Sequence, residues 1–234
     1  MAFVDAQSRI DTIPSGGTLC LEAADYEPIV VQRPITLKGC GSTCFWGDLG
    51  KPAIEIRSDG VRLQGLMLRH RSKYMADAQP PLTLVVSAQA NPVFLEVRIS
   101  GSVVGVAGES DGWCLPPILE LGDISYPSAV FTMEMAVPKR CELASRVAGI
   151  AFDLPKLVAG VCQVRLIARG LIQDSLIAGY LEIISDRLTR VIPLFGRVSK
   201  LTGSEKPPVK SLYRLTEKQR KVFLHLQRRV DQPG

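Results

Sequence analysis

Cysteine and histidine side chains are the first candidates for chemistry in this chain, because they bind metals and act as nucleophiles. Cys40 and Cys44 are separated by three residues, and a zinc site on this pair would need two further ligands, for which Cys20 and His70 are the nearest candidates. A Cys44–His70 nucleophilic dyad is the alternative. Neither arrangement matches a recognised motif. We therefore interpret the cysteines as small buried apolar residues and predict no catalytic, metal-binding or cofactor-binding residue. The six cysteines occupy positions 20, 40, 44, 114, 141 and 162.

A local group of cations forms a second candidate site. Its members are Arg57, Arg62, Arg69, Arg71 and Lys73. Alternate positions of a strand share one face, so Arg62, Arg69 and Arg71 are predicted to line an exposed sheet. The pattern favours a phosphate-rich or acidic-protein ligand, or else edge charges that discourage strand-to-strand aggregation. No aromatic residues alternate with these cations in the sequence, which disfavours single-stranded nucleic acid.

The C-terminal segment carries the net charge of the chain. The formal charge is +5 at pH 7, and residues 199–234 hold nine Lys or Arg residues against three acidic residues. The segment opens with a linker-like sequence at 203–208 and continues in a predicted amphipathic helix. Thr216 is the expected N-cap, and Gln219 completes a capping box.

The predicted helix has one apolar face, which comprises Val222, Phe223, Leu226 and Val230. A helix of about 15 residues is marginal alone, so we expect it to dock on a partner. Electrostatic binding of nucleic acid or of an anionic membrane through this basic segment is an alternative that we do not favour. The predicted partner-binding residues are Lys218, Lys221, Val222, Phe223, Leu226, Arg228 and Arg229.

The remainder of the chain is patterned as short strands. Residues 16–101 hold apolar-alternating segments that recur roughly every 8 to 12 residues between Gly, Pro or Asp turns, which indicates stacked coils that share one core. Residues 114–198 follow a Gly-rich break and hold strands such as Val130–Val137, which favours an antiparallel β-sandwich. We therefore predict an all-β protein with three parts. These are a short parallel β-helix at 1–110, a sandwich at 114–198, and a basic linker with an amphipathic helix at 199–234.

The first part resembles the opening coils of pectate-lyase-like, right-handed parallel β-helix proteins. These often contain a Gly-Gly-Thr-Leu strand, an Ala-x-x-Tyr-x-x-Pro turn and a Pro-Ile-Thr-Leu-x-Gly strand. The corresponding segments in this chain are Gly16–Leu19, Ala23–Pro28 and Arg33–Gly39, and Gly60–Leu66 and Phe94–Gly101 match later coils. The resemblance implies a fold, and the same strand pattern serves unrelated activities.

Enzymes of that family imply clustered carboxylates. Glycoside hydrolysis needs two carboxylates about 5 to 9 Å apart, but no Asp-Asp pair or Asp-x-x-Asp motif occurs in residues 1–110. The nearest pair is Glu55 with Asp59, and Glu55 alternates with two isoleucines, so we expect it to face solvent. Polysaccharide binding or cleavage is therefore an alternative function and not the leading one.

The second part is similar to the immunoglobulin-like sandwiches that serve as accessory modules in bacterial multidomain proteins. The segments that carry this resemblance are Leu119–Ile124, Leu157–Gly160 and Ile192–Val198. The Cys…Trp…Cys pattern of antibody domains is missing. The resemblance implies a module that binds protein or spaces other domains.

Taken together, these patterns predict a non-enzymatic interaction, scaffold or adaptor module in a larger bacterial assembly. It would dock on a protein partner through the β-helix face and the C-terminal helix. The sequence predicts no particular oligomeric state. The N-terminus lacks the layout of a secretory signal, and no apolar run approaches the roughly 20 residues that cross a bilayer. We therefore expect a cytoplasmic protein with no transmembrane segment and no cofactor.

Overall fold

The chain folds into a mostly β structure with two compact units. The computed structural model describes residues 2–71, 82–106, 113–116, 118–185, 188–201 and 209–230, with only the backbone at residues 222 and 225–230. Unit 1 comprises Met1–Asp111 with Arg187–Arg190, and unit 2 comprises Gly112–Asp186 with Val191–Gly234. The predicted all-β class is confirmed, with two short helices. Within these residue ranges, neither helix is long and apolar enough to cross a membrane.

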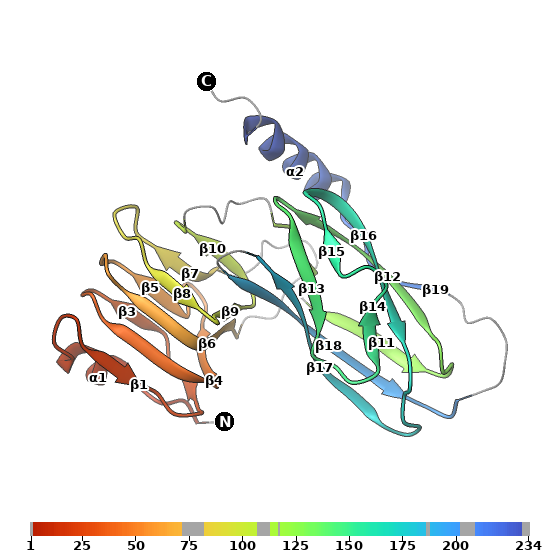
Figure 1. Ribbon diagram of the computed structural model, residues 1–234, viewed down its shortest axis with the longest axis horizontal. Coiled ribbons are helices and arrows are strands. Elements are labelled where there is room, and N and C mark those ends of the chain that lie inside the picture. Colours follow the sequence, from red (N-terminus) through yellow and green to blue (C-terminus); the bar gives the residue numbers. More distant parts are fainter. Residues whose placement is uncertain are drawn as a thin grey trace. The chain divides into compact units, whose positions relative to one another are not determined.

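Unit 1 consists of short strands that stack as parallel rungs (Figure 1). One set of rungs comprises β1 (Thr18–Cys20), β2 (Asp25–Tyr26), β4 (Thr36–Gly47), β6 (Arg62–His70), β8 (Val93–Leu95) and β9 (Arg98–Ile99). A separate sheet comprises β3 (Ile29–Val31), β5 (Ile54–Ile56), β7 (Leu82–Val86) and β10 (Ser102–Val104). The chain passes back and forth between the two sets, so each rung rests on the one before it.

Glycines allow β4 and β6 to run close together where the rungs bend. Gly65 in β6 has a φ of +62°, and a Cβ at this position would lie 2.8 Å from the carbonyl oxygen of Gly39 in β4. The register between the two strands shifts at the same level, between Lys38 and Thr43. Only a residue without a side chain fits this approach in this conformation. β6 therefore has one segment before Gly65, which pairs with β8, and another after it, which pairs with β9, while both segments pair with β4.

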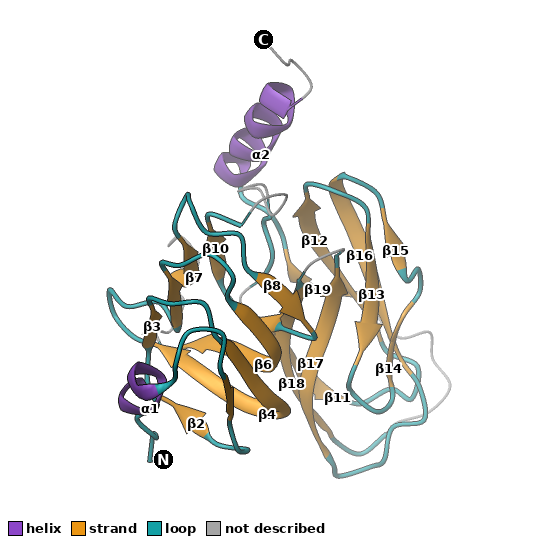
Figure 2. Cartoon of the chain, turned by 60° about the vertical axis from the view of Figure 1, so that its left-hand side comes forward, coloured by secondary structure: helices purple, strands orange, loops and turns teal. Residues whose placement is uncertain are grey.

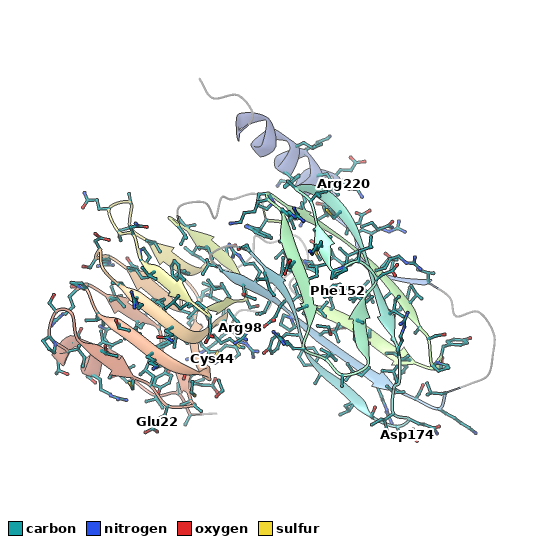
Figure 3. The ribbon with its side chains drawn as sticks, viewed as in Figure 1. Glu22, Cys44, Arg98, Phe152, Asp174 and Arg220 are labelled. Carbon is teal, nitrogen blue, oxygen red and sulfur yellow. The ribbon has the colours of Figure 1, made fainter. Side chains whose placement is uncertain are left out.

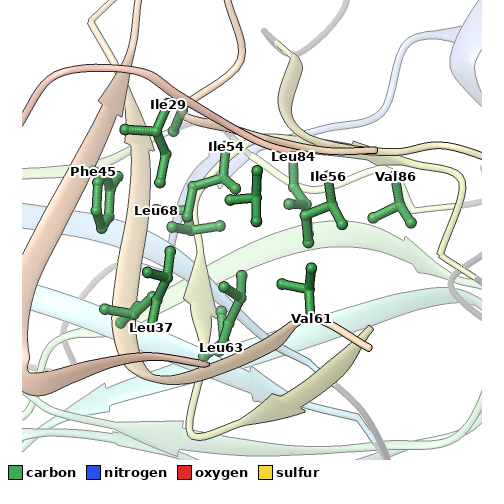
Figure 4. Close-up of a cluster of buried hydrophobic side chains, with 14 of the residues drawn as sticks. Ile29, Leu37, Phe45, Ile54, Ile56, Val61, Leu63, Leu68, Leu84 and Val86 are labelled. Atoms are coloured by element: carbon green, nitrogen blue, oxygen red, sulfur yellow. The ribbon is translucent and has the colours of Figure 1, made fainter. Parts of the chain in front are cut away.

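The core of unit 1 is a stack of apolar side chains that repeats from rung to rung (Figure 4). Ile29 pairs with Ile54, and Ile54 pairs with Leu84. The rings of Tyr26 and Phe45, also on neighbouring rungs, stack with centroids 5.1 Å apart. Because each rung covers only part of its neighbour, the stability of the unit depends on stacking.

The N-terminal segment caps one end of this stack. Val4 forms a parallel bridge with Tyr26, and α1 (Gln7–Thr12) follows it. The side-chain amide of Gln7 accepts a hydrogen bond from the backbone N–H of Val30 at 2.8 Å and donates one to its carbonyl oxygen at 3.1 Å. Gln7 thus forms the hydrogen bonds that a neighbouring strand would form with the backbone of Val30 at the edge of β3.

A segment far along the chain contributes a rung to unit 1. Thr189 and Arg190, the first residues of β18 (Thr189–Val198), pair in parallel with β9. Arg190 is 4% exposed, and its Nη1 donates a hydrogen bond to the carbonyl oxygen of Gly101 at 2.9 Å. Leu188 joins the core of the stack. The strand pattern of the sequence places these residues in the second part of the chain. Their pairing with β9 joins segments that are far apart in the sequence, so no local signal indicates it.

Unit 2 contains two sheets that share one apolar core (Figure 2). The first sheet comprises β11 (Leu119–Ile124), β18, β17 (Leu176–Ile184), β13 (Cys141–Ser145) and β15 (Lys156–Leu157). The second comprises β14 (Ile150–Phe152), β16 (Gly160–Ala168), β12 (Val130–Val137) and β19 (Val209–Tyr213). Leu121, Met135, Leu166 and Leu181 are fully buried in the shared core.

Strand pairing in unit 2 is mixed, whereas the sequence pattern predicts antiparallel pairing. The pairs β12–β16 and β13–β17 are antiparallel, but β11–β18 and β12–β19 are parallel. β19 lies in the segment predicted to be a linker and a helix. Its first three residues are exposed, with Val209 at 59%, so no buried alternation marks the strand in the sequence.

Candidate functional site

The described cations of the predicted basic patch have different neighbours and do not form one surface. Arg57 forms an ion pair with Glu55, with 2.7 Å between Nε and Oε1. Arg62 is exposed and lies before the Gly65 bend, opposite Thr36 of β4 and Val93 of β8, whereas Arg69 lies after the bend, opposite Trp46 of β4. Lys73 lies outside the described residues. Only Arg69 and Arg71 are therefore brought together with a common set of neighbours.

The guanidinium groups of these two arginines lie over aromatic rings from other segments of unit 1. Trp46 is the cross-strand partner of Arg69, and the guanidinium carbon of Arg69 lies 5.5 Å from the centre of a Trp46 ring. That of Arg71 lies 3.6 Å from the ring centre of Phe3, and the Phe3 and Trp46 rings meet edge to face. No pattern along a single strand indicates this cluster, because Trp46 lies in β4 and Phe3 lies in the N-terminal segment.

Carboxylates neutralise much of the positive charge in this cluster. Arg71 pairs with Glu27 at 3.2 Å and with Asp48 at 3.6 Å. The indole N–H of Trp46 donates a hydrogen bond to Asp25 at 2.6 Å. The cation–π contact with Phe3 adds to these interactions. The cluster therefore ties the N-terminal segment to the stack, and its geometry favours a structural role over the binding of an external anion.

The acidic residues considered for hydrolysis bind other partners. Glu55 pairs with Arg57, and Asp59 accepts a hydrogen bond from the backbone N–H of Asn91 at 3.1 Å. Each carboxylate thus has a local structural contact. Among the residues that the structure describes, no group of three or more His, Cys, Asp or Glu side chains is arranged to hold a metal ion.

The thiols of the Cys40–Cys44 segment differ sharply in their chemistry. Cys40 is exposed, and hydrogen bonds with the hydroxyls of Ser42 and Thr43 lower its pKa to about 7. Burial raises the pKa of Cys44 to about 12. A buried thiol of this kind is not a thiolate near neutral pH, which argues against the Cys44–His70 dyad. Cys40 is the better nucleophile, although the sequence does not distinguish it.

Helix α2 (Glu217–Val230) starts beside the second sheet of unit 2. Its predicted capping box is confirmed, because the backbone N–H of Gln219 donates to the Thr216 hydroxyl at 3.2 Å and that of Thr216 donates to the Gln219 side chain at 2.8 Å. From this start the helix extends away from the strands of its own unit (Figures 1 and 2).

Two contacts anchor the start of α2. Phe223 is 2% exposed and packs with Leu215 and with Ala136 of β12. The neighbouring Glu134 pairs with Arg220, which Figure 3 labels near the foot of the helix, and accepts a hydrogen bond from the backbone N–H of Leu215 at 3.1 Å. Phe223 is among the predicted partner-binding residues, but its ring is already covered within unit 2.

The other predicted tail residues fall into two groups. Lys218 and Lys221 are exposed. Leu224, which is not among the predicted residues, is 49% exposed. Three-residue spacing places these side chains along one stripe of the helix, turned away from Phe223. The structure does not describe the side chains of the remaining group, which comprises Val222, Leu226, Arg228 and Arg229.

A small cavity of about 70 Å³ lies at the foot of α2. Its lining residues are Thr132, Met133, Glu134, Gln163, Ser211, Tyr213 and Arg214. Small-molecule sites are usually several hundred Å³. This cavity therefore suits water and not an organic substrate.

No family model matches this chain, and no curated protein matches it.

Proposed function

We propose that the chain is a non-enzymatic adaptor that binds a protein partner through the apolar face of α2. Phe223 begins this face, and the helix continues for about two turns beyond it. Leu226 and Val230 follow Phe223 at the spacing of a single helix face. The contacts described for α2 lie at its start, and a short helix gains stability when an apolar groove covers the rest of its apolar face. The fixed start of α2 is the observation that carries this proposal.

The charge of the segment defines the surface that such a partner would offer. Lys218 and Lys221 are exposed on the helix, and Arg228 and Arg229 follow in the sequence. An apolar groove with an acidic rim complements this arrangement, because opposite charges at the edge guide association and fix orientation. A protein groove is preferred over nucleic acid because the helix pattern combines its cations with a continuous apolar face, which phosphate contacts alone would leave exposed.

The two units would act as the body that carries this helix. We propose that unit 1 is a short right-handed parallel β-helix of the pectate-lyase-like type and that unit 2 is an immunoglobulin-like sandwich. The parallel rungs support the first assignment, since parallel crossovers are almost always right-handed, and the core shared by two sheets supports the second. All six cysteines are free thiols, which fits the proposed cytoplasmic location in a bacterium.

A truncation tests the role of α2. Removal of residues 199–234 would delete β19, which pairs with β12, so the truncation should end at Leu224 and leave Phe223 in place. Tagged full-length and truncated chains would be purified from native cells, and captured proteins quantified by mass spectrometry. We expect one protein to be enriched with the full chain only, while both chains keep the same thermal midpoint. Equal capture by both chains would contradict the proposal, and so would loss of the captured material after nuclease treatment.

A further inference from the structure

Two cysteines face the shared core of unit 2 from opposite sheets. Cys141 begins β13 in the first sheet, and Cys162 lies in β16 of the second. Cys141 is buried in the core cluster, and the partly buried Cys162 packs against the same cluster. Both side chains therefore point into the space between the sheets.

The backbone around these cysteines brings them to the same end of the sandwich. Cys141 pairs with Leu157 across β13 and β15. The thiol of Cys162 donates a hydrogen bond to the carbonyl oxygen of Val158, the residue after Leu157, at 3.3 Å. Burial, and after it the charge of the Cys162 thiolate, raise the pKa of Cys141 to about 11. The Leu157–Val158 segment thus contacts both cysteines and brings their thiols to the same region of the core.

We propose that Cys141 and Cys162 form an intersheet disulfide when the protein meets a small-molecule disulfide such as oxidised glutathione. The Cys162 thiolate attacks one sulfur of the oxidant and releases one glutathione thiolate. The Cys141 thiolate then attacks the Cys162 sulfur of the mixed disulfide and releases the second. Two protein thiols are oxidised to one disulfide, one oxidised glutathione is reduced to two thiols, and the two protein protons pass to these products.

The position of Cys162 connects this reaction to the foot of α2. Cys162 is the cross-strand partner of Met135, which lies between the two β12 residues that hold the helix, Glu134 and Ala136. A disulfide would tie this sheet to the opposite one through β13. The inference stands independently of the proposed partner, because it concerns chemistry within unit 2 alone.

The raised pKa of Cys141 sets the expected rate. At neutral pH only a small fraction of this thiol is ionised, so disulfide closure is slow and accelerates roughly tenfold for each pH unit between 7 and 9. The exposed Cys20 and Cys40 would react with the oxidant at the surface. A chain with Cys20→Ser and Cys40→Ser removes this background without altering unit 2.

Oxidation of that chain with glutathione disulfide, followed by peptide mass mapping, tests the inference. We expect a mass loss of about 2 Da with a Cys141–Cys162 peptide and a thermal midpoint raised by roughly 5 to 10 °C. Addition of Cys141→Ser should leave a stable glutathione adduct on Cys162. A Cys162 adduct that persists while Cys141 is present would overturn the inference, as would a link from either thiol to Cys114. Peptide mapping of the chain that keeps both thiols shows whether the Cys141–Cys162 disulfide forms, even if the Cys141 variant does not fold.

Discussion

Glu134 on β12 pairs with Arg220 on α2, and the same carboxylate accepts a hydrogen bond from the backbone N–H of Leu215 at 3.1 Å. One side chain therefore holds both the residue before the helix cap and the first turn of the helix. Together with the burial of Phe223, this contact fixes the direction in which α2 extends from β12.

Substitution of Glu134 by Gln should weaken this anchor, because the amide can still accept the hydrogen bond from Leu215 but carries no charge for Arg220. We expect a loss of about 1 kcal/mol in the free energy of unfolding, measured by urea denaturation. Glu142→Gln is the matched control, since Glu142 pairs with Lys156 at 3.7 Å and both side chains are at least 60% exposed. Equal losses in the two variants would show that the Glu134 contact is not an anchor.

The close approach of β4 and β6 predicts a difference between two glycine substitutions. Gly65 and Gly41 both have a positive φ, but a Cβ at Gly65 would lie 2.8 Å from the Gly39 oxygen, whereas a Cβ at Gly41 would point into open space, with no contact within 4 Å. Ala at either site costs about 1 kcal/mol of backbone strain. Ala at Gly65 should cost roughly 2 kcal/mol more, because the rungs must separate. Denaturant unfolding of both variants measures this difference, and similar values would refute the packing argument.

The cap on unit 1 predicts a local change in hydrogen exchange. Gln7→Ala removes both hydrogen bonds to Val30 and leaves the edge of β3 to solvent. The amide of Val30 should exchange roughly fivefold faster or more, since it loses about 1 kcal/mol or more of local protection. Gln7→Glu keeps the acceptor for this amide and is expected to restore much of the protection. If Val30 exchanges equally fast in both variants, the side chain does not act as a substitute strand.

The exposed thiol of Cys40 predicts a pH-dependent reactivity. Its pKa is lowered to about 7 by the hydroxyl of Ser42 and then by that of Thr43, so the thiolate fraction rises as pH increases through 7. The rate of alkylation by iodoacetamide should therefore be half-maximal near pH 7. Ser42→Ala should move this midpoint upward, while Cys44 stays unmodified because burial raises its pKa to about 12. An unchanged midpoint in the variant would exclude the proposed cause.

Local sequence signals predict local structure well in this protein. The Thr216–Gln219 capping box is confirmed because its members are three residues apart. The strand Val130–Val137 is also confirmed with its predicted bounds, since apolar alternation directly reflects its burial. These features depend on residues that are neighbours in the sequence.

Features that depend on register between distant segments were not predictable. Prediction of the contact between Arg69 and Trp46 would require knowledge of which rungs are adjacent. The rung at Thr189 and the strand β19 likewise exist because remote strands offer an edge to pair with. Of the predicted tail site, Lys218 and Lys221 are exposed, whereas Phe223 is covered within its own unit, and partner binding stays a prediction.

The most direct measurement of the adaptor proposal compares Leu226→Asp with Leu224→Asp in the full-length chain. Leu226 shares the helix face that Phe223 begins, whereas Leu224 is 49% exposed on another side. Both variants add the same charge to the same turn, so the quantity of partner captured from native cells reports on the face alone. We predict that Leu226→Asp abolishes capture at an unchanged thermal midpoint while Leu224→Asp retains most of it. Full capture by Leu226→Asp, or equal loss in both variants, would contradict the assignment of this face as the docking surface.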